Sequence, residues 1–416
     1  MEGSRWSVVI VGAGPAGTST ALSLAKLDPG LARRILLLDR AVHPRPKVCA
    51  GGLIPATWRQ LAQLGLDARV PATHVERAVV RTPAQVVEYG PEPLCTVVRR
   101  DEFDHLLVRA CTERGIAYRG GEKVVGLARE ADGVVVHTTR GAYRATVVVG
   151  ADGAGSLVRR TLFPSAVGGM GRAVMADLPL NQVRWHGWPD RFEFDFFDVG
   201  RGLRGYGWIF PCWIGGEPHV NVGVYSSRGA GAGAAVRACL QRLLGRIGAP
   251  PEVRWQAAPI RWYRGRPKIA GERVLLVGDA AGVDGLMGEG ISYSFEYGAW
   301  AARSIVRGLQ NARFDFVEAE EEFHRSWVGT KLRRLALLER LFYGRSHRLW
   351  FLLAEQSAAA RAIGLRWYNG VDGWDRVSGW QALQAWWTGR TTPRQSPLAS
   401  AETLEQAVGD RAWHES

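Results

Sequence analysis

Residues 7–26, SVVIVGAGPAGTSTALSLAK, decide the fold of this chain. A short β-branched run leads into a glycine-rich turn, and the turn leads into a segment with apolar residues at helical spacing. A second apolar run, ILLL at residues 35–38, follows and ends at Asp39. This order predicts a β-α-β unit, so we expect an α/β protein with a Rossmann-like parallel sheet.

Three glycines in this turn stand at the spacing of a dinucleotide-binding loop. Gly12 permits the tight turn, Gly14 lets the backbone approach a pyrophosphate, and Gly17 lets the helix pack close to the strand. A helix that begins near Pro15 would point free N–H groups at the phosphates. Asp39 would accept hydrogen bonds from ribose hydroxyls. A turn that only packs would explain the glycines but not this acid, so we interpret the unit as a dinucleotide site.

Two later segments are predicted to join the same sheet. They are TVVVGADGAGSLVRR at 146–160 and ERVLLVGDAAGVDGLMGEGISYSFEYGAWAA at 272–302. Each places an aspartate, Asp152 or Asp279, just beyond the carboxyl end of a strand, where open α/β sheets bind ligands. The alternative for either residue is an N-cap of the next helix.

The composition limits the class of protein. With 416 residues, 46% of them hydrophobic, the chain can bury two or three structural units and is not a disordered protein. The formal net charge of +13 suits phosphorylated ligands or an anionic membrane surface. The five cysteines are scattered and form no CxxC pair, so the sequence predicts neither disulfides nor a metal site. This use of cysteine fits a reducing compartment. No apolar run approaches the roughly 18 residues of a membrane span, so we expect a cytoplasmic protein.

Together, the GAGPAG, GADG and GDAAG segments resemble the FAD-binding signatures of the para-hydroxybenzoate hydroxylase type of flavoprotein, over most of residues 1–310. Arg100 in RRDEFDHLL resembles that family's arginine at the flavin nucleotide. The resemblance implies FAD as the cofactor, with Asp39 at the ribose, where Glu is commoner in the family, and Asp279 at the ribityl chain. The cofactor-binding residues expected on this basis are Gly12, Gly14, Pro15, Ala16, Gly17, Asp39, Arg40, Lys47, Gly51, Gly52, Arg100, Asp152, Gly278, Asp279, Gly288, Gly290 and Ile291.

Three features are more similar to the geranylgeranyl reductase family than to the hydroxylases. They are KVCAGGL at 47–53, similar to K-x-C-G-G-G; YGWIFP at 206–211, similar to the cavity-lining YxWxFP; and GDAAG followed by GEGI. The chain departs from the family at Ala50, and the loop between Gly282 and Gly288 lacks the usual proline and is one residue shorter. The resemblance implies reduction of C=C bonds in an isoprenoid-type, lipophilic substrate.

Reduction of an unactivated C=C bond needs a hydride from the flavin and a proton from an acid close to the ring. Cys49, placed among glycines, is the first candidate for this acid, although free cysteine more often behaves as a small buried hydrophobe. Glu289, which precedes the helix expected beside the flavin, is the second catalytic candidate. No second GxGxxG opens a helix, so NADPH or another reductant would visit transiently as electron donor.

Alternation of aromatic residues in YGWIFP predicts one face of a strand. Tyr206, Trp208 and Phe210 would form an apolar wall of the substrate cavity, with Pro211 beside them, unless they are ordinary sheet core. Two other functions stay open for the same fold. One is a monooxygenase or a halogenase, since GYGWIFP partly resembles the halogenase GWxWxIP motif. The other is a non-enzymatic prenyl-binding module, against which the intact glycines and Asp279 argue.

The flavin domain is expected to be discontinuous, because residues 74–98 and 170–263 alternate as antiparallel strands do. The expected segments are FAD-binding at 1–73, 99–165 and 265–312, substrate-binding at 74–98 and 166–264, helical at 313–390, and a loose tail at 391–416.

The helical region combines basic and aromatic residues. Leucines at helical spacing around position 335 are accompanied by Lys331, Arg333, Arg334, Arg340, Arg345 and Arg348, which face only Glu339. With a cluster formed by Trp367, Trp374, Trp380, Trp386 and Trp387, this pattern suits an anionic membrane interface, and the alternative is a helical cap on the substrate sheet. We therefore expect a lipophilic small-molecule substrate and no nucleic acid partner, and a peripheral position at the inner face of the membrane stays open beside the helical cap.

Overall fold

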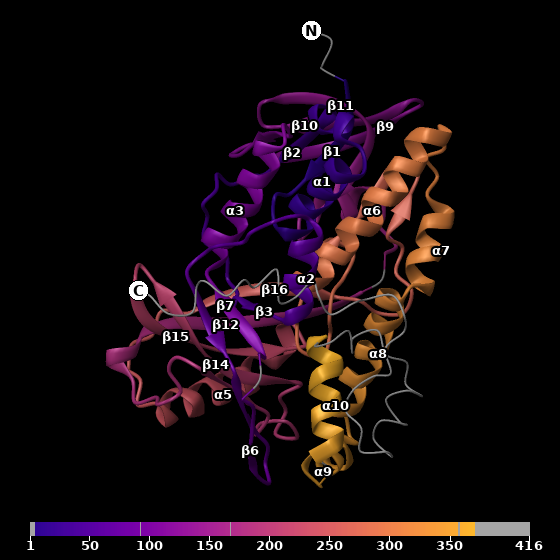
Figure 1. The fold of residues 1–416 in the computed structure, drawn as a ribbon. Coiled ribbons are helices and arrows are strands. Elements are labelled where there is room, and N and C mark those ends of the chain that lie inside the picture. The colour runs from indigo at the N-terminus through magenta and orange to yellow at the C-terminus, as the bar shows by residue number, and fades with distance from the viewer. Residues whose placement is uncertain (1–4, 92, 167, 357, 371–416) are drawn as a thin grey trace.

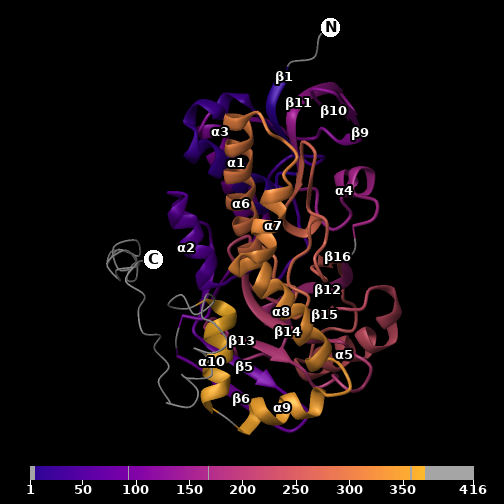
Figure 2. The ribbon, with the colours of Figure 1, turned by 90° about the vertical axis from the view of Figure 1, so that its right-hand side faces the viewer.

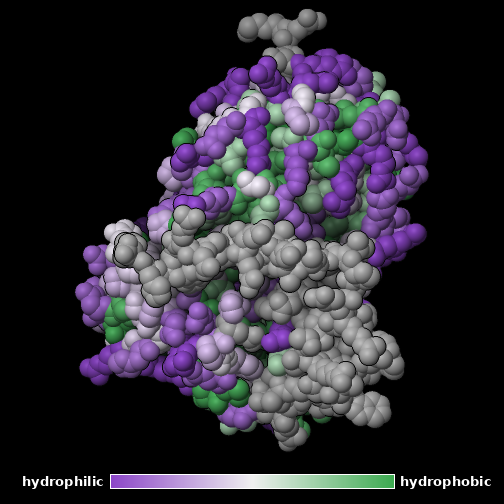
Figure 3. All heavy atoms as spheres, viewed as in Figure 1, coloured by the Kyte–Doolittle hydropathy of each residue, from purple (hydrophilic) through white to green (hydrophobic). Residues whose placement is uncertain are grey.

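The computed structural model describes residues 5–370 apart from residues 92, 167 and 357. Two large sheets lie in opposite halves of an elongated molecule, and the C-terminal helices run along one side of both (Figure 1). The surface around the first sheet is mostly hydrophilic, with apolar patches between the polar side chains (Figure 3). Among the described residues, no helix combines the length and the apolar character that crossing a membrane requires.

The first sheet confirms the predicted Rossmann-like fold. Its central strand β1 pairs in parallel with β2 on one side and with β11 on the other, and α1 (Pro15–Leu27) connects β1 to β2. The core strands are buried apolar runs, as is typical of parallel strands covered on both faces. In spatial order the path is β17 (Ala270–Gly271), β18 (Val274–Leu276), β11 (Gly141–Gly150), β1 (Arg5–Val11), β2 (Ile35–Leu38) and β8 (Ala117–Arg119), with β9 (Val124–Glu130) and β10 (Gly133–Thr138) attached to β11.

Close packing of two helices brings their N-termini to the carboxyl edge of this sheet. A Cβ added to Gly298 of α6 (Ile291–Asn311) would lie 2.3 Å from Ser19 Oγ of α1, so the glycine is needed for this approach. The Ser19 hydroxyl donates to the Ser294 carbonyl across the contact, at 3.0 Å. Near the edge, a Cβ on Gly278 would lie 2.6 Å from Ala16 Cβ, so α1 and the turn after β18 meet there. Helix α3 (Arg100–Glu113) also packs against α1.

The second sheet has an apolar layer on each face. Along β14, Ile209 faces α5 (Gly233–Arg246), whereas Tyr206, Trp208 and Phe210 face the aromatic cluster on the other side. This alternation confirms the predicted strand. The order is β16 (Gln256–Trp262), β12 (Gly169–Pro179), β15 (Glu217–Ser226), β14 (Gly205–Ile214), β13 (Arg191–Asp195), β5 (Arg77–Arg81) and β6 (Val86–Tyr89).

Three features of this half differ from the sequence prediction. Helix α5 was not distinguished from the strands around it, although Val236, Leu240 and Leu243 stand at helical spacing. Strand β13 pairs with β5 in parallel, whereas all other neighbours in the sheet are antiparallel. A separate small sheet is formed by β3 (Gly52–Leu53), β7 (Cys95–Val98) and β4 (Ala72–Val75), so not all strands of 74–98 join the large sheet. The domain boundaries stay a prediction.

The C-terminal region is helical, as predicted, and lies across both halves (Figure 2). Lys331 does not lie on an outer cationic face: it is 5% exposed, and its Nζ donates to the Trp367 and Tyr368 carbonyls, because the end of α10 packs against it. Trp374, Trp380, Trp386, Trp387 and the tail 391–416 lie outside the described residues. The helices are α7 (Val317–Arg325), α8 (Trp327–Phe342), α9 (His347–Gln356) and α10 (Ala358–Asn369), and the shorter α2 (Pro55–Gln63) and α4 (Leu157–Leu162) lie earlier in the chain.

Candidate active site

The turn between β1 and α1 offers a cradle for a phosphate group. Gly12 has φ +107°, and a Cβ there would lie 2.3 Å from the Ala151 carbonyl oxygen, so only glycine fits. In contrast, a Cβ on Gly14 would meet only Arg45 Nη2, at 3.7 Å. Helix α1 begins there without a side-chain cap and without an acidic residue in its first turn. Free N–H groups beside open space are what a pyrophosphate requires, so the turn fits FAD.

Asp39 lies at the tip of β2, beside this turn. Its Oδ2 accepts a hydrogen bond from the Ala13 N–H and its Oδ1 one from the Ala41 N–H, each at 2.8 Å. Burial alone would raise the pKa of Asp39, but the nearby His43 ring, with Nε2 3.8 Å from Oδ2, and the hydrogen bonds from these two backbone groups hold it below its ordinary value. The carboxylate is therefore ionised at neutral pH, and its remaining lone pairs are acceptors for ribose hydroxyls.

Asp152 supports a turn of the same edge from within. Its carboxylate accepts hydrogen bonds from the Ser156 hydroxyl and from the N–H groups of Leu157 (2.6 Å) and Val158 (3.2 Å). These contacts correspond to the N-cap alternative, since they satisfy the first turn of α4. Direct contact between Asp152 and a nucleotide stays a prediction.

Asp279, in the turn after β18, has an open acceptor. None of the described residues donates a hydrogen bond to its carboxylate, and a Cβ on Gly290, at the start of α6, would lie 3.2 Å from its Oδ1. Burial raises the pKa of Asp279, and the positive charges of Lys47 and Arg100 oppose that rise. A half-buried carboxylate without a donor fits the hydroxyl groups of a ribityl chain.

Arg100 is held in place by a second acid. It is 8% exposed, and its Nε and Nη2 donate to Asp104 at 2.8 and 2.9 Å. Burial would lower the pKa of Arg100, but Asp104 and the sulfur of Cys49 keep it above its ordinary value. The guanidinium is therefore a fixed positive charge between the 47–53 segment and the strand edge.

The 47–53 segment brings Cys49 between Arg100 and the second sheet. Gly51 has φ +82°, and a Cβ there would lie 1.9 Å from the Val98 carbonyl oxygen. The Gly51 N–H lies 3.4 Å from Cys49 Sγ and donates to it. A Cβ on Gly52 would lie 3.3 Å from the Phe210 ring, so the segment touches the aromatic wall. Ala50, the departure from the family motif, packs against the same aromatic cluster.

The aromatic wall has its polar atoms satisfied. The Tyr206 hydroxyl donates to the Met287 carbonyl at 2.7 Å, and the Trp208 ring N–H donates to Asn221 Oδ1 at 2.7 Å. Phe194 stands edge-on to Tyr206, with the ring centroids 5.3 Å apart. All three rings of the wall are buried, so their role as a wall of a substrate cavity stays a prediction. Pro211 is one residue out of this alternation and lies on the opposite face of β14, so the structure does not bring it together with the three aromatic residues.

Glu289 stands in the loop that enters α6. Its carboxylate accepts hydrogen bonds from the Ser292 N–H at 2.8 Å and from the Ser292 hydroxyl at 2.6 Å. Burial raises the pKa of Glu289 to about 7 despite these hydrogen bonds, and the nearby carboxylate of Asp284 adds to the rise. Near neutral pH this group can therefore both give and take a proton.

Asp284 is a site residue that the sequence analysis missed. It is fully buried and accepts hydrogen bonds from the N–H groups of Leu286 (2.7 Å) and Met287 (3.1 Å) and from the Tyr368 hydroxyl (2.9 Å). Burial raises the pKa of Asp284, and these hydrogen bonds partly offset the rise. An acid between glycines in GVDG was a usable signal, but nothing in the pattern pointed to Tyr368.

The substitution Tyr368→Phe is expected to lower the free energy of unfolding by about 2 kcal/mol, because it removes a hydrogen bond to a buried carboxyl group. Tyr343→Phe is the matched control: that hydroxyl donates to the neutral Leu286 carbonyl at 2.8 Å, so a loss of about 1 kcal/mol is expected. Urea unfolding measures both values. Equal losses would contradict a special contribution from Asp284.

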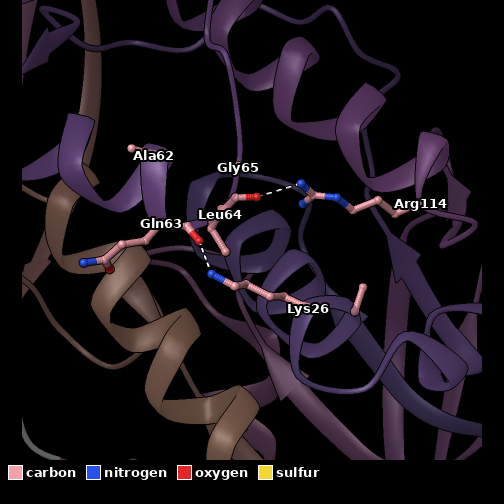
Figure 4. A pocket seen from close by; sticks show the side chains of 7 residues that line it. Lys26, Ala62, Gln63, Leu64, Gly65 and Arg114 are labelled. Atoms are coloured by element: carbon pink, nitrogen blue, oxygen red, sulfur yellow. Dashed lines mark hydrogen bonds between the residues drawn. The ribbon is translucent and has the colours of Figure 1, made fainter. Parts of the chain in front are cut away.

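A surface hollow of about 350 Å³ lies apart from this site, at the C-terminal ends of α1 and α2 (Figure 4). Lys26 Nζ donates to the Gln63 carbonyl, and Arg114 donates to the Leu64 carbonyl at 2.7 Å. Basic side chains near the last carbonyls of a helix satisfy otherwise free acceptors, so these contacts stabilise the end of α2. We assign the hollow no part in the chemistry.

Comparison with known proteins agrees with the cofactor cradle. A family model described as an FAD binding domain matches residues 5–202. The chain is 31% identical over 327 residues to the menaquinone reductase of Mycobacterium tuberculosis, covering 72% of this chain and 76% of that one. It is 30% identical over 337 residues to digeranylgeranylglycerophospholipid reductase 1 of Methanopyrus kandleri, covering 74% and 82%.

The fold is also similar to a solved structure. A geranylgeranyl bacteriochlorophyll reductase-like protein of Thermoplasma acidophilum superposes with a TM-score of 0.64 at 18% identity, covering 98% of this chain and 96% of that one. The match to the FAD binding domain model confirms FAD as the cofactor, and the transient reductant stays a prediction. Because the strand-edge cradle, the curated relatives and the fold agree, the chain belongs to the geranylgeranyl reductase family of FAD-dependent oxidoreductases, within the para-hydroxybenzoate hydroxylase superfamily.

Proposed function

We propose that this protein reduces C=C bonds in the isoprenoid chain of a lipophilic substrate. The observation that carries the proposal is that the aromatic rings of β14 contact both the segment that holds Cys49 and the loop that holds Glu289. Gly52 lies against Phe210, and Tyr206 donates to Met287, two residues before Glu289. The relatives support the same substrate class, since menaquinone and digeranylgeranylglycerophospholipids both carry isoprenoid chains.

The chain's own residues would divide the work as follows. The N-terminus of α1 and Asp39 would hold the FAD nucleotide, and Asp279 would accept from its ribityl chain. Reduced FAD would supply the hydride that one carbon of the double bond receives. The rings of Tyr206, Trp208 and Phe210 would bind the hydrocarbon and exclude water. An acid, Cys49 or Glu289, would give its proton to the other carbon.

The test is an anaerobic single turnover. The purified FAD-loaded protein is photoreduced and incubated with geranylgeranyl compounds, and mass spectrometry follows gains of two hydrogens. We expect reduced product without oxygen, and photoreduction separates this step from the natural donor, NADPH or another transient reductant. Turnover that requires oxygen would assign the protein to the monooxygenases or halogenases instead. If the protein cannot be loaded with FAD, the remaining function is that of a non-enzymatic prenyl-binding module.

Cys49→Ser is expected to slow product formation about tenfold while leaving the FAD content intact, because the hydroxyl is a weaker acid than the thiol. The serine hydroxyl is smaller than the thiol, so it fits the same place beside the Arg100 guanidinium and the Gly51 N–H. The control is Cys239→Ser, in α5 on the far side of the second sheet. An unchanged rate in Cys49→Ser would remove Cys49 as the proton source.

A further inference from the structure

Helix α9 lies at one end of the molecule (Figures 1 and 2). Its residue Leu349 is 56% exposed and its residue Leu352 is 46% exposed. Arg348 and Leu349 stand four and three residues from Leu352, so helical periodicity places all three on one side of α9. Scattered single leucines on a surface are ordinary, but two on one side of a short helix form a patch.

The exposed charged residues that the structure describes around this patch are basic. They are Arg340, at the end of α8, and Arg345 and Arg348, at the start of α9. Residues 326–356 contain two acids, of which Glu355 has a side chain outside the described residues. The other, Glu339, is 3% exposed and accepts hydrogen bonds from Arg204 and Ser227, so it does not offset the outer arginines. The corner therefore complements an anionic surface.

The inner face of α9 contacts the wall of the candidate active site. Phe351 is 7% exposed and packs against Phe196, with 5.9 Å between ring centroids. Phe196 in turn lies 5.6 Å from the Tyr206 ring centroid. One helix thus connects the outer leucines with the surface that would bind the hydrocarbon.

We propose that the corner formed by Arg340, Arg345, Arg348, Leu349 and Leu352 docks the protein on an anionic lipid bilayer. The leucines enter the acyl boundary while the arginines contact the headgroups. The inference rests on the proposed function, because an isoprenoid lipid resides in the bilayer and would reach the aromatic wall beside α9 from there.

Vesicle co-sedimentation of the full-length, FAD-loaded protein tests the proposal. The vesicles contain phosphatidylcholine with about one-third phosphatidylglycerol and no isoprenoid lipid, so binding is measured without turnover. We expect the wild type to bind and high salt to weaken binding. The double variants Leu349→Asp/Leu352→Asp and Arg345→Glu/Arg348→Glu are each expected to reduce the partition coefficient about tenfold or more.

Matched controls come from the opposite half of the molecule. Leu27, which ends α1, is 49% exposed, and Arg33 and Arg34 are exposed in the short 3-10 helix that follows. Leu27→Asp and Arg33→Glu/Arg34→Glu are expected to bind like the wild type. Three results would each overturn the proposal. The α9 variants could bind as well as the wild type, the wild type could fail to bind, or the wild type could be a dimer that these variants dissociate. Turnover of detergent-dispersed substrate is expected to persist in the variants, so failure of docking and failure of the reductase function are separable.

Discussion

Gly14→Val is expected to give a folded protein that has lost FAD, with an affinity for the cofactor at least about 100-fold lower. The backbone of Gly14 has φ −78° and ψ −176°, which valine adopts readily, and a Cβ there would have its nearest neighbour 3.7 Å away. The valine side chain would instead fill the space that a pyrophosphate needs beside the N-terminus of α1. Because the phosphate interaction is the main anchor of the nucleotide, its loss removes most of the affinity.

The measurement combines FAD titration with circular dichroism and urea unfolding. The matched control is Gly245→Val in α5, where a Cβ would meet nothing within 4 Å and where no cofactor contact is expected. A folded Gly14→Val that binds FAD within a fewfold of the wild type would show that the cradle has been assigned to the wrong residue.

Glu289→Gln is expected to slow the reduction of substrate about 100-fold and to remove a limb of its pH profile. The amide oxygen of glutamine can still accept the hydrogen bond from the Ser292 N–H, but the amide has no acidic proton to transfer to the substrate. With the pKa of Glu289 raised to about 7, the carboxyl group is protonated below that pH and ionised above it. The wild-type rate should therefore be constant in acid and fall about tenfold per pH unit above pH 7, whereas the variant should show no such fall.

Single-turnover rates between about pH 5 and pH 9, with FAD content and substrate affinity measured alongside, test this expectation. Glu217→Gln, at the exposed start of β15, is the control and should follow the wild-type profile. A variant that keeps the alkaline limb would assign that limb to another group, and Glu289 would then be a capping residue of α6.

The sequence was most informative where local pattern and fold coincide. The glycine turn, its two flanking strands and Asp39 were all predicted, because buried parallel strands are continuous apolar runs and because Gly12 and Gly17 each allow a close backbone contact. The alternation of Tyr206, Trp208 and Phe210 likewise survives in β14, where ten residues pair without a bulge.

The sequence failed where residues distant along the chain supply the partner. Asp284 was not singled out, because its third donor, Tyr368, lies 84 residues later. Lys331 was grouped with the outer arginines because its acceptors are backbone carbonyls, which no sequence pattern displays. Helix α5 is different, because the helical spacing of Leu240 and Leu243, which pack against the second sheet, was a usable signal.

The anchoring of the last described residues has a consequence for biosynthesis. Tyr368 donates to Asp284, Asn369 to the Leu94 carbonyl and Arg59 to the Gly370 carbonyl. The loop before α6 thus obtains its final partner only after at least 368 of the 416 residues have been translated. A nascent chain can therefore form the strands of its nucleotide-binding half first, and the loop before α6 receives the Tyr368 hydrogen bond only after α10 has been synthesised.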